Sequence, residues 1–204
     1  VNTGGLGLGP LVGGILAQFA PAPLVTPFVV FTTLFAIALT VCASVPETVE
    51  HPIDRSWWPR RVHIPAFART SFFAAALDTA AAFSVIGLLM ALSGSILHQV
   101  LEETSLLAVG GVVFVLMTAS AVAQVAMGRT SQRSQLRIGA VCMLVGLGVI
   151  GLIVRIPSTV LLLAAVAVAG AGVGLIFKAG VSVASAAAER DNRGEVLAVM
   201  FLAA

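Results

Sequence analysis

Two ionisable residues lie inside long uncharged stretches of the chain and are the first candidates for binding a proton or a substrate. Asp78 is the single charged residue between positions 70 and 97, and Lys178 is the single one between 156 and 188. A charge inside a membrane helix costs about 2.5–3.5 kcal/mol on insertion scales, so such residues usually face a bundle interior and often pair. The two residues predict a proton-linked or substrate-linked ion pair. The alternative is a structural pair that only locks two helices together.

The two charges are expected at similar depth. Asp78 lies nine residues after Arg69, and Lys178 lies eleven residues before Glu189. At about 1.5 Å per helical residue, they sit roughly 13 and 16 Å from the same membrane face. Ser182 follows Lys178 by four residues and shares its helix face. We therefore expect Asp78, Lys178 and Ser182 to line a substrate or proton pathway, although a serine can also simply bond across helices.

The composition predicts that these residues belong to membrane helices. The chain is 59% hydrophobic and 10% charged, whereas soluble domains carry about 25% charged residues. A membrane helix needs about 20 apolar residues. The uncharged stretches therefore predict an all-α, polytopic transmembrane helical bundle of six helices and the start of a seventh. Two helices fill residues 1–46, and the others occupy 70–97, 104–128, 138–154, 156–188 and the chain from 196 onward.

Basic residues predict which ends of the helices share a side of the membrane. The connections 47–69, 128–137 and 189–195 alternate along the chain and contain nine of its eleven lysines and arginines. The positive-inside rule places these three loops in the cytoplasm, as in a multi-pass protein of the cell (inner or plasma) membrane. The segment Trp57–Arg61 predicts an interfacial anchor, with a regulatory or partner-binding site as the alternative.

Several classes of function lack a sequence signal. The chain has no Ser-His-Asp set, no His-Glu-x-x-His motif and no phosphate-binding loop. We therefore expect no enzyme, no catalytic residues, no metal site and no cofactor. A net charge of +2 gives no reason to expect a nucleic acid partner.

Small residues at helical spacing predict close helix packing. The pairs Gly5-x3-Gly9 and Gly170-x3-Gly174 each remove side-chain bulk from one helix face, which lets two backbones approach. Pro10 removes a backbone hydrogen bond and bends its helix, and Gly13 and Gly14 extend the smooth face. Such a kinked helix can pack tightly and still rock against a neighbour, as moving parts of transporters must.

The run Gly5-x3-Gly9-Pro10-x2-Gly13-Gly14 resembles the antiporter motif on the fifth helix of drug–proton antiporters of the major facilitator superfamily. Residues 128–137 are similar to the weaker copy, between helices eight and nine, of that family's Gly-x-x-x-Asp-Arg-x-Gly-Arg-Arg loop. Gly128, Arg133 and Arg137 match that loop, whereas Gln132 replaces the acid and Gln135 replaces the second glycine.

The resemblance implies a division of the chain. Residues 1–46 would be helices five and six, 47–69 the cytoplasmic central loop, and 70–204 helices seven to ten with the start of eleven. The chain would then be a fragment without helices one to four and twelve. Asp78 on helix seven and Lys178 on helix ten would face the central cavity. The glycine motif would pack against helix eight, between the two halves.

The implied function is proton-coupled efflux of small hydrophobic compounds by alternating access. The implied partners are the lipid bilayer, the substrate, protons and the missing helices of the same transporter. One alternative is uptake of a polar solute such as a sugar or organic acid, whose cavity should be richer in polar and charged groups. Another is a non-transporting membrane scaffold or a decayed gene product.

Overall fold

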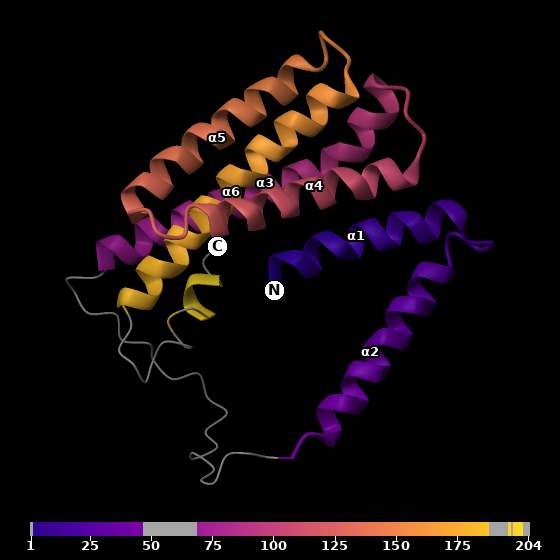
Figure 1. Ribbon diagram of the computed structural model, residues 1–204, viewed down its shortest axis with the longest axis horizontal. Helices are drawn as coiled ribbons and strands as arrows, with labels where there is room; N and C mark the ends of the chain where they lie inside the picture. The colour runs from indigo at the N-terminus through magenta and orange to yellow at the C-terminus, as the bar shows by residue number, and fades with distance from the viewer. Residues whose placement is uncertain (1, 47–68, 188–195, 197, 202–204) are drawn as a thin grey trace.

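The computed structural model describes residues 2–46, 69–187, 196 and 198–201. Within these residues the chain is helical and contains no strand, which confirms the expected all-α bundle (Figure 1). The elements are α1 (Asn2–Phe19), α2 (Thr26–Ser44), α3 (Arg69–Ser95), the π-helical turn η2 (Ile96–Val100), α4 (Leu106–Ala126), α5 (Gln132–Leu152) and α6 (Thr159–Ala187).

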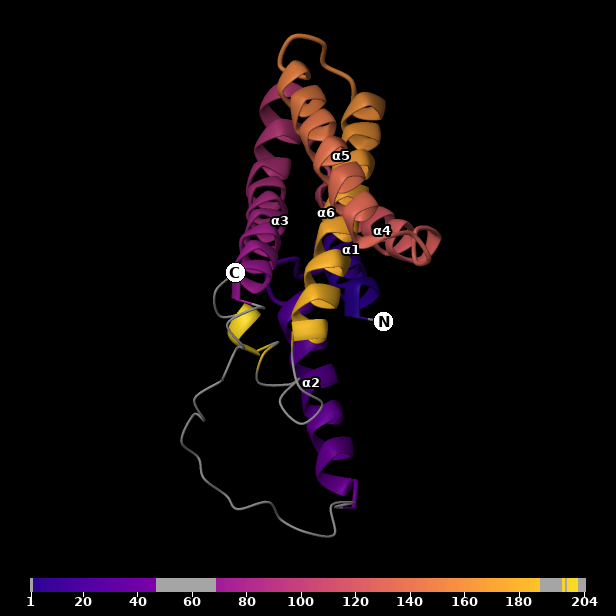
Figure 2. The ribbon, with the colours of Figure 1, turned by 90° about the vertical axis from the view of Figure 1, so that its left-hand side faces the viewer.

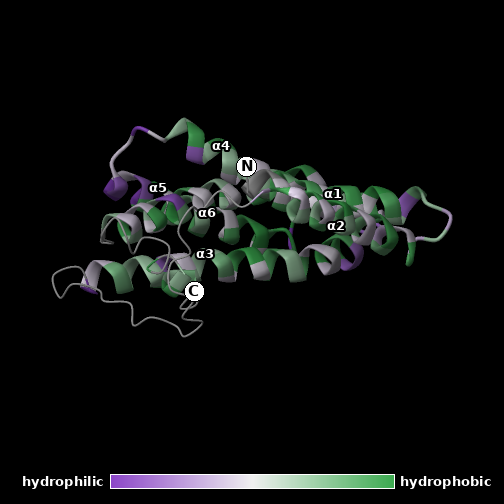
Figure 3. Cartoon of the chain, turned by 90° about the horizontal axis from the view of Figure 1, so that it is seen from below, coloured by the Kyte–Doolittle hydropathy of each residue, from purple (hydrophilic) through white to green (hydrophobic). Residues whose placement is uncertain are grey.

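Five of the helical segments are long and apolar enough to cross a membrane. They are α2, α3 continued by η2, α4, α5 and α6, while α1 contributes a shorter apolar helix over Gly5–Phe19. A helix suits these sequences because hydrocarbon offers no partner for a backbone N–H or C=O, and a helix bonds them internally. Figure 3 shows the long apolar middles of the helices, with hydrophilic residues gathered towards their ends.

Helix α6 is the centre of the bundle. It contacts α5, α4 and α3, and its residues Ala169 and Ala179 are fully buried. Figure 2 shows α6 between its neighbours. Because short connections join α3, α4, α5 and α6 in succession, α6 runs parallel to α4 and antiparallel to α3 and α5.

Glycines bring α6 and α4 into backbone contact. A Cβ atom at Gly170 would overlap the carbonyl oxygen of Leu116, and one at Gly174 would overlap that of Ser120. The close packing predicted for this glycine pair is therefore confirmed, with α4 as its partner. Such contacts replace the hydrophobic driving force that lipid does not supply between helices.

Helix α5 begins earlier than the sequence predicted. A start at residue 138 was expected from the first uncharged position, but the helix begins at Gln132. The Ser131 hydroxyl accepts a hydrogen bond from the Ser134 N–H at 3.3 Å, which caps the helix and lets polar residues form its first turns. Arg133 and Arg137 therefore lie on α5 and not in the connection that precedes it.

One end of the bundle carries most of the described basic residues, and we call it the basic end. It comprises the start of α3 at Arg69, the end of α4, residues 128–137 and the end of α6, and lies at the left of Figure 1. Beside it, Val196 and Met200 pack against Phe72 of α3. The predicted loops at 47–68 and 189–195, including Trp57–Arg61, lie outside the described residues.

Candidate functional site

Helix α1 lies against α4 along a seam of small residues. A Cβ atom at Gly14 would lie 2.8 Å from the Leu106 carbonyl oxygen, and one at Gly110 would overlap the carbonyl oxygen of Pro10. At one end of the seam, Gln18 Oε1 accepts a hydrogen bond of 2.9 Å from the Leu106 N–H. This bond satisfies one of the free donors at the start of α4.

Of the glycine–proline run predicted to pack against α4, Pro10 and Gly14 contact it, and Gly7 adds a contact that was not expected. A Cβ atom at Gly7 would lie 2.9 Å from the Met117 Cβ, whereas Gly5, Gly9 and Gly13 have no atom within 4 Å of theirs. The contact face of α1 therefore repeats every seven residues, through Gly7 and Gly14. The series Gly5, Gly9 and Gly13 points elsewhere, because residues four apart drift around the helix by about 40° at each step.

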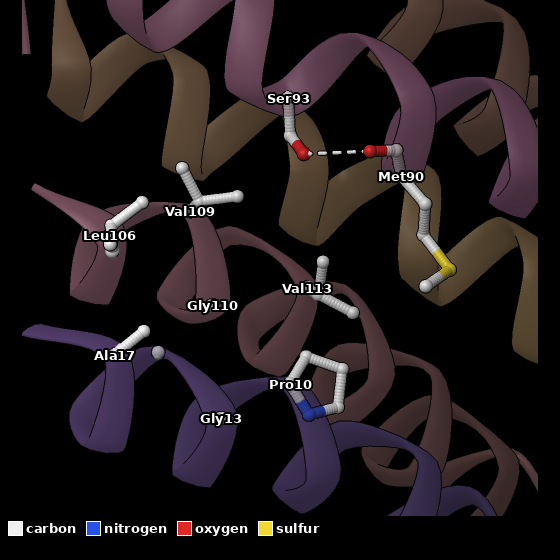
Figure 4. A pocket seen from close by; sticks show the side chains of 10 residues that line it. Pro10, Gly13, Ala17, Met90, Ser93, Leu106, Val109, Gly110 and Val113 are labelled. Atoms are coloured by element: carbon white, nitrogen blue, oxygen red, sulfur yellow. Dashed lines mark hydrogen bonds between the residues drawn. The ribbon is translucent and has the colours of Figure 1, made fainter. Parts of the chain in front are cut away.

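The first cavity, which we call the Pro10 cavity, opens beside this seam. It has a volume of about 310 Å³ and lies between α1, α3 and α4. In Figure 4, Pro10 and Val113 face each other across it, and Ser93 donates its hydroxyl proton to the Met90 carbonyl at 3.1 Å. The lining residues are Pro10, Gly13, Gly14, Ala17, Met90, Ser93, Leu106, Val109, Gly110 and Val113.

The second cavity, which we call the Phe177 cavity, is smaller and more aromatic. It has a volume of about 80 Å³. The rings of Phe83, Phe177 and Phe201 come from three elements and lie pairwise with centroids 5.9–6.4 Å apart. The lining residues are Leu6, Phe83, Ile86, Met117, Ser120, Gln124, Val173, Phe177 and Phe201.

Lys178 binds the end of α4. Its Nζ donates a hydrogen bond of 2.5 Å to the backbone carbonyl oxygen of Gln124. That oxygen lies in the last turn of α4, where the Gly128 N–H bonds to Val125 instead. The ammonium group thus caps an orphan carbonyl and neutralises the negative end of the helix dipole. Gly128 leaves room for this contact, since a Cβ atom there would lie 3.0 Å from Nζ.

Asp78 and Lys178 do not form the expected ion pair. Lys178 continues the α4-facing series that Gly170 and Gly174 begin, whereas α3 packs on another face of α6, where Gly180 meets Thr79. Asp78 is half-buried beside Thr79 on α3, and among the described residues it has no hydrogen bond or ion pair.

Ser182 is also half-buried, and its hydroxyl makes no hydrogen bond within the part of the chain that the structure describes. The three pathway candidates Asp78, Lys178 and Ser182 therefore lie on two neighbouring helices, α3 and α6, without a hydrogen bond or ion pair to one another. They make no joint site in this structure.

Gln135 holds the connection between α4 and α5. Its side chain is 3% exposed, and Nε2 donates to the carbonyl oxygens of Met127 at 2.9 Å and Thr130 at 3.2 Å. Arg133 and Arg137 are exposed and make no bond to the described residues. Sequence reasoning missed this structural role of Gln135. The available signal was its place in the motif, where a glutamine replaces a glycine.

These features define a polytopic α-helical membrane protein with cavities between its helices. The model of one family, the Major Facilitator Superfamily, matches residues 1–204. The chain belongs to this superfamily, whose members are membrane transporters and not enzymes, so its function is transport across a membrane. No curated protein and no solved structure matches the chain.

Proposed function

We propose that the chain serves proton-coupled efflux of small hydrophobic compounds across the cell membrane by alternating access. In this proposal it is of the drug–proton antiporter type, and α1 and α2 correspond to the fifth and sixth helices of the family. Helices α3 to α6 then correspond to the seventh to tenth, and the basic end faces the cytoplasm. The proposal also takes residues 47–69 as the central loop between two halves.

The residues that line the two cavities are the basis for proposing a hydrophobic substrate. None of the residues that line them is charged, and the polar side chains among them are Ser93, Ser120 and Gln124. Apolar walls favour a ligand whose apolar surface leaves water. A sugar or an organic acid would bury groups without partners, at about 1–3 kcal/mol each. The lining therefore supports a hydrophobic substrate over a polar one.

The seam between α1 and α4 supports alternating access. Leu6 and Met117 line the Phe177 cavity, while Pro10 and Val113, about one turn further along the same two helices, line the Pro10 cavity. The two cavities thus follow one another along a single seam of small residues. A smooth seam of this kind lets the two helices rock, which would open one cavity as the other closes.

We propose that the Asp78 carboxyl binds the proton whose movement drives export. Its carboxyl lies within a membrane-spanning helix, where ionisable residues usually mark ion or proton pathways. A proton can bind there without breaking a bond to any described residue. Lys178 and Ser182 continue the polar positions on α6 towards the basic end.

Transport by membrane vesicles that contain a transport-competent protein with this sequence tests the proposal. We expect a lipophilic dye to be exported, and a protonophore or Asp78→Asn to abolish the export. Glu102→Gln is the matched control, because this exposed carboxylate lies outside the helices and its loss should leave export intact. Uptake of a labelled sugar or organic acid in place of dye export, or export that survives a protonophore, would contradict the proposal.

A further inference from the structure

We propose that the Phe177 cavity is a recognition subsite for compounds that carry an aromatic ring together with an N–H or O–H donor. This inference rests on the proposed function, because it assigns a substrate class to a cavity of the same pathway. The Phe177 cavity differs from the Pro10 cavity, which has no aromatic residue in its lining and whose Ser93 hydroxyl is already bonded to Met90.

Three phenylalanine rings supply the aromatic part of the subsite. The ring of Phe83 stands edge-on to those of Phe177 and Phe201, with interplanar angles of 82° and 65°. All centroid distances fall in the range where aromatic pairs attract each other beyond their buried area. Phe83 and Phe201 remain 39% and 45% exposed, so both rings keep surface for a further ring. An aromatic ligand would extend the cluster.

One amide supplies the polar part. Gln124 Nε2 donates to the Ser120 hydroxyl oxygen at 3.3 Å, and Gln124 Oε1 accepts no hydrogen bond from the described residues. The backbone carbonyl of the same residue is held by Lys178, so the residue is anchored at both its backbone and its side chain. The amide oxygen is therefore a positioned acceptor in a cavity whose other lining side chains, apart from Ser120, are apolar, and it would pair with a donor on the ligand.

The volume of the Phe177 cavity limits the size of the ligand group that it can bind. A volume of about 80 Å³ is smaller than the roughly 150 Å³ of a cavity that binds benzene. The cavity therefore admits only part of a small ring system, and the rest of the ligand would lie outside it against the exposed surfaces of Phe83 and Phe201. Indole is a suitable probe because it is flat, uncharged and carries one N–H donor. N-methylindole is its matched partner without that donor.

Equilibrium dialysis of radiolabelled indole against the chain in lipid nanodiscs tests the subsite, with empty nanodiscs measuring partition into lipid. We expect saturable binding of indole to the chain and about fivefold weaker binding of N-methylindole, the loss of one neutral hydrogen bond. Phe177→Leu should weaken both probes about two- to tenfold, the range for one aromatic contact. Phe35→Leu is the matched control, because this ring on α2 is 73% exposed, and it should change neither affinity.

The amide is tested by Gln124→Met, which keeps the backbone bond to Lys178. It should lower indole affinity to that of N-methylindole and leave N-methylindole unchanged, as a double-mutant cycle requires for one specific pair. If Phe177→Leu loses its helical circular dichroism, Phe201→Leu replaces it, because it removes a ring from a different element. The subsite would be overturned if nanodiscs with the chain bound no more indole than empty nanodiscs. It would also be overturned if Gln124→Met lowered the affinities for indole and N-methylindole equally. Dye export without specific indole binding would refute the subsite alone, and saturable, ring-dependent indole binding without export would refute the efflux function alone.

Discussion

The seam between α1 and α4 offers a test on two adjacent glycines. A Cβ atom at Gly110 would overlap the Pro10 carbonyl oxygen, whereas one at Gly111 has no atom within 4 Å. Both positions lie within α4, so alanine should gain about 0.5–1 kcal/mol of helix propensity at either. At Gly110 the added methyl must also push the two backbones apart, and overpacking of this kind costs about 1–3 kcal/mol.

We therefore expect Gly111→Ala to raise the free energy of unfolding slightly and Gly110→Ala to lower it by up to about 2 kcal/mol. The difference between the two variants should equal the overpacking cost of about 1–3 kcal/mol. Reversible unfolding by SDS in mixed micelles, followed by circular dichroism, measures both. Gly13 and Gly14 form the reciprocal pair on α1, and Gly14→Ala should be the destabilising member.

Equal changes in the free energy of unfolding for Gly110→Ala and Gly111→Ala would refute the reasoning. They would mean that α4 responds to alanine in general and not to the contact between Gly110 and Pro10. The same holds if Gly13→Ala destabilises as much as Gly14→Ala. The two adjacent pairs together separate the geometry of the seam from the behaviour of glycine in membrane helices at large.

Three further predictions concern polar contacts and use the same unfolding measurement. Lys178→Met should cost about 1.5–3 kcal/mol, because it removes a charged donor from the Gln124 carbonyl, and Lys178→Arg should recover part of the loss; an unchanged stability would contradict the capping role. Gln135→Ala should cost about 1–3 kcal/mol, because two hydrogen bonds from its buried side chain to backbone carbonyls are lost, each worth about 0.5–1.5 kcal/mol, while the exposed neighbour Gln132 should tolerate alanine within about 0.5 kcal/mol. Ser131→Ala should cost about 1 kcal/mol through loss of the α5 cap, and a cost near zero would show that α5 does not depend on it.

The sequence was sufficient to predict the helices, because apolar runs long enough to span a bilayer leave the backbone one structure that satisfies its polar groups. It was insufficient for the start of α5. Five of the six residues 132–137 are polar and indicate a connection, yet a serine cap and the hydrogen bonds of Gln135 to the preceding turn allow them to be helical. Charge marks where a span leaves the hydrocarbon, and a helix can continue beyond that point.

Contacts between helices were harder to predict than the helices themselves. The glycine motif identified α1 as a packing helix, but the side of α1 that meets α4 depends on how the helix is rotated, which spacing alone does not fix. Lys178 was expected to seek an opposite charge. Its long side chain instead reaches a backbone carbonyl of α4, and every helix end offers such acceptors regardless of sequence.

The unequal lengths of the helices have a consequence for the surrounding lipid. Helix α4 has 21 residues, or about 31 Å of rise, which matches a hydrocarbon thickness of about 30 Å. Helix α6 has 29 residues and rises about 43 Å, so it must tilt, emerge from the hydrocarbon or thicken the bilayer locally. Gly170, Gly174 and Lys178 fasten α6 to α4, so a tilt adopted by the long helix is imposed on the short one. Hydrophobic mismatch therefore couples membrane thickness to the angle of α4, and thereby to the seam that α4 forms with α1.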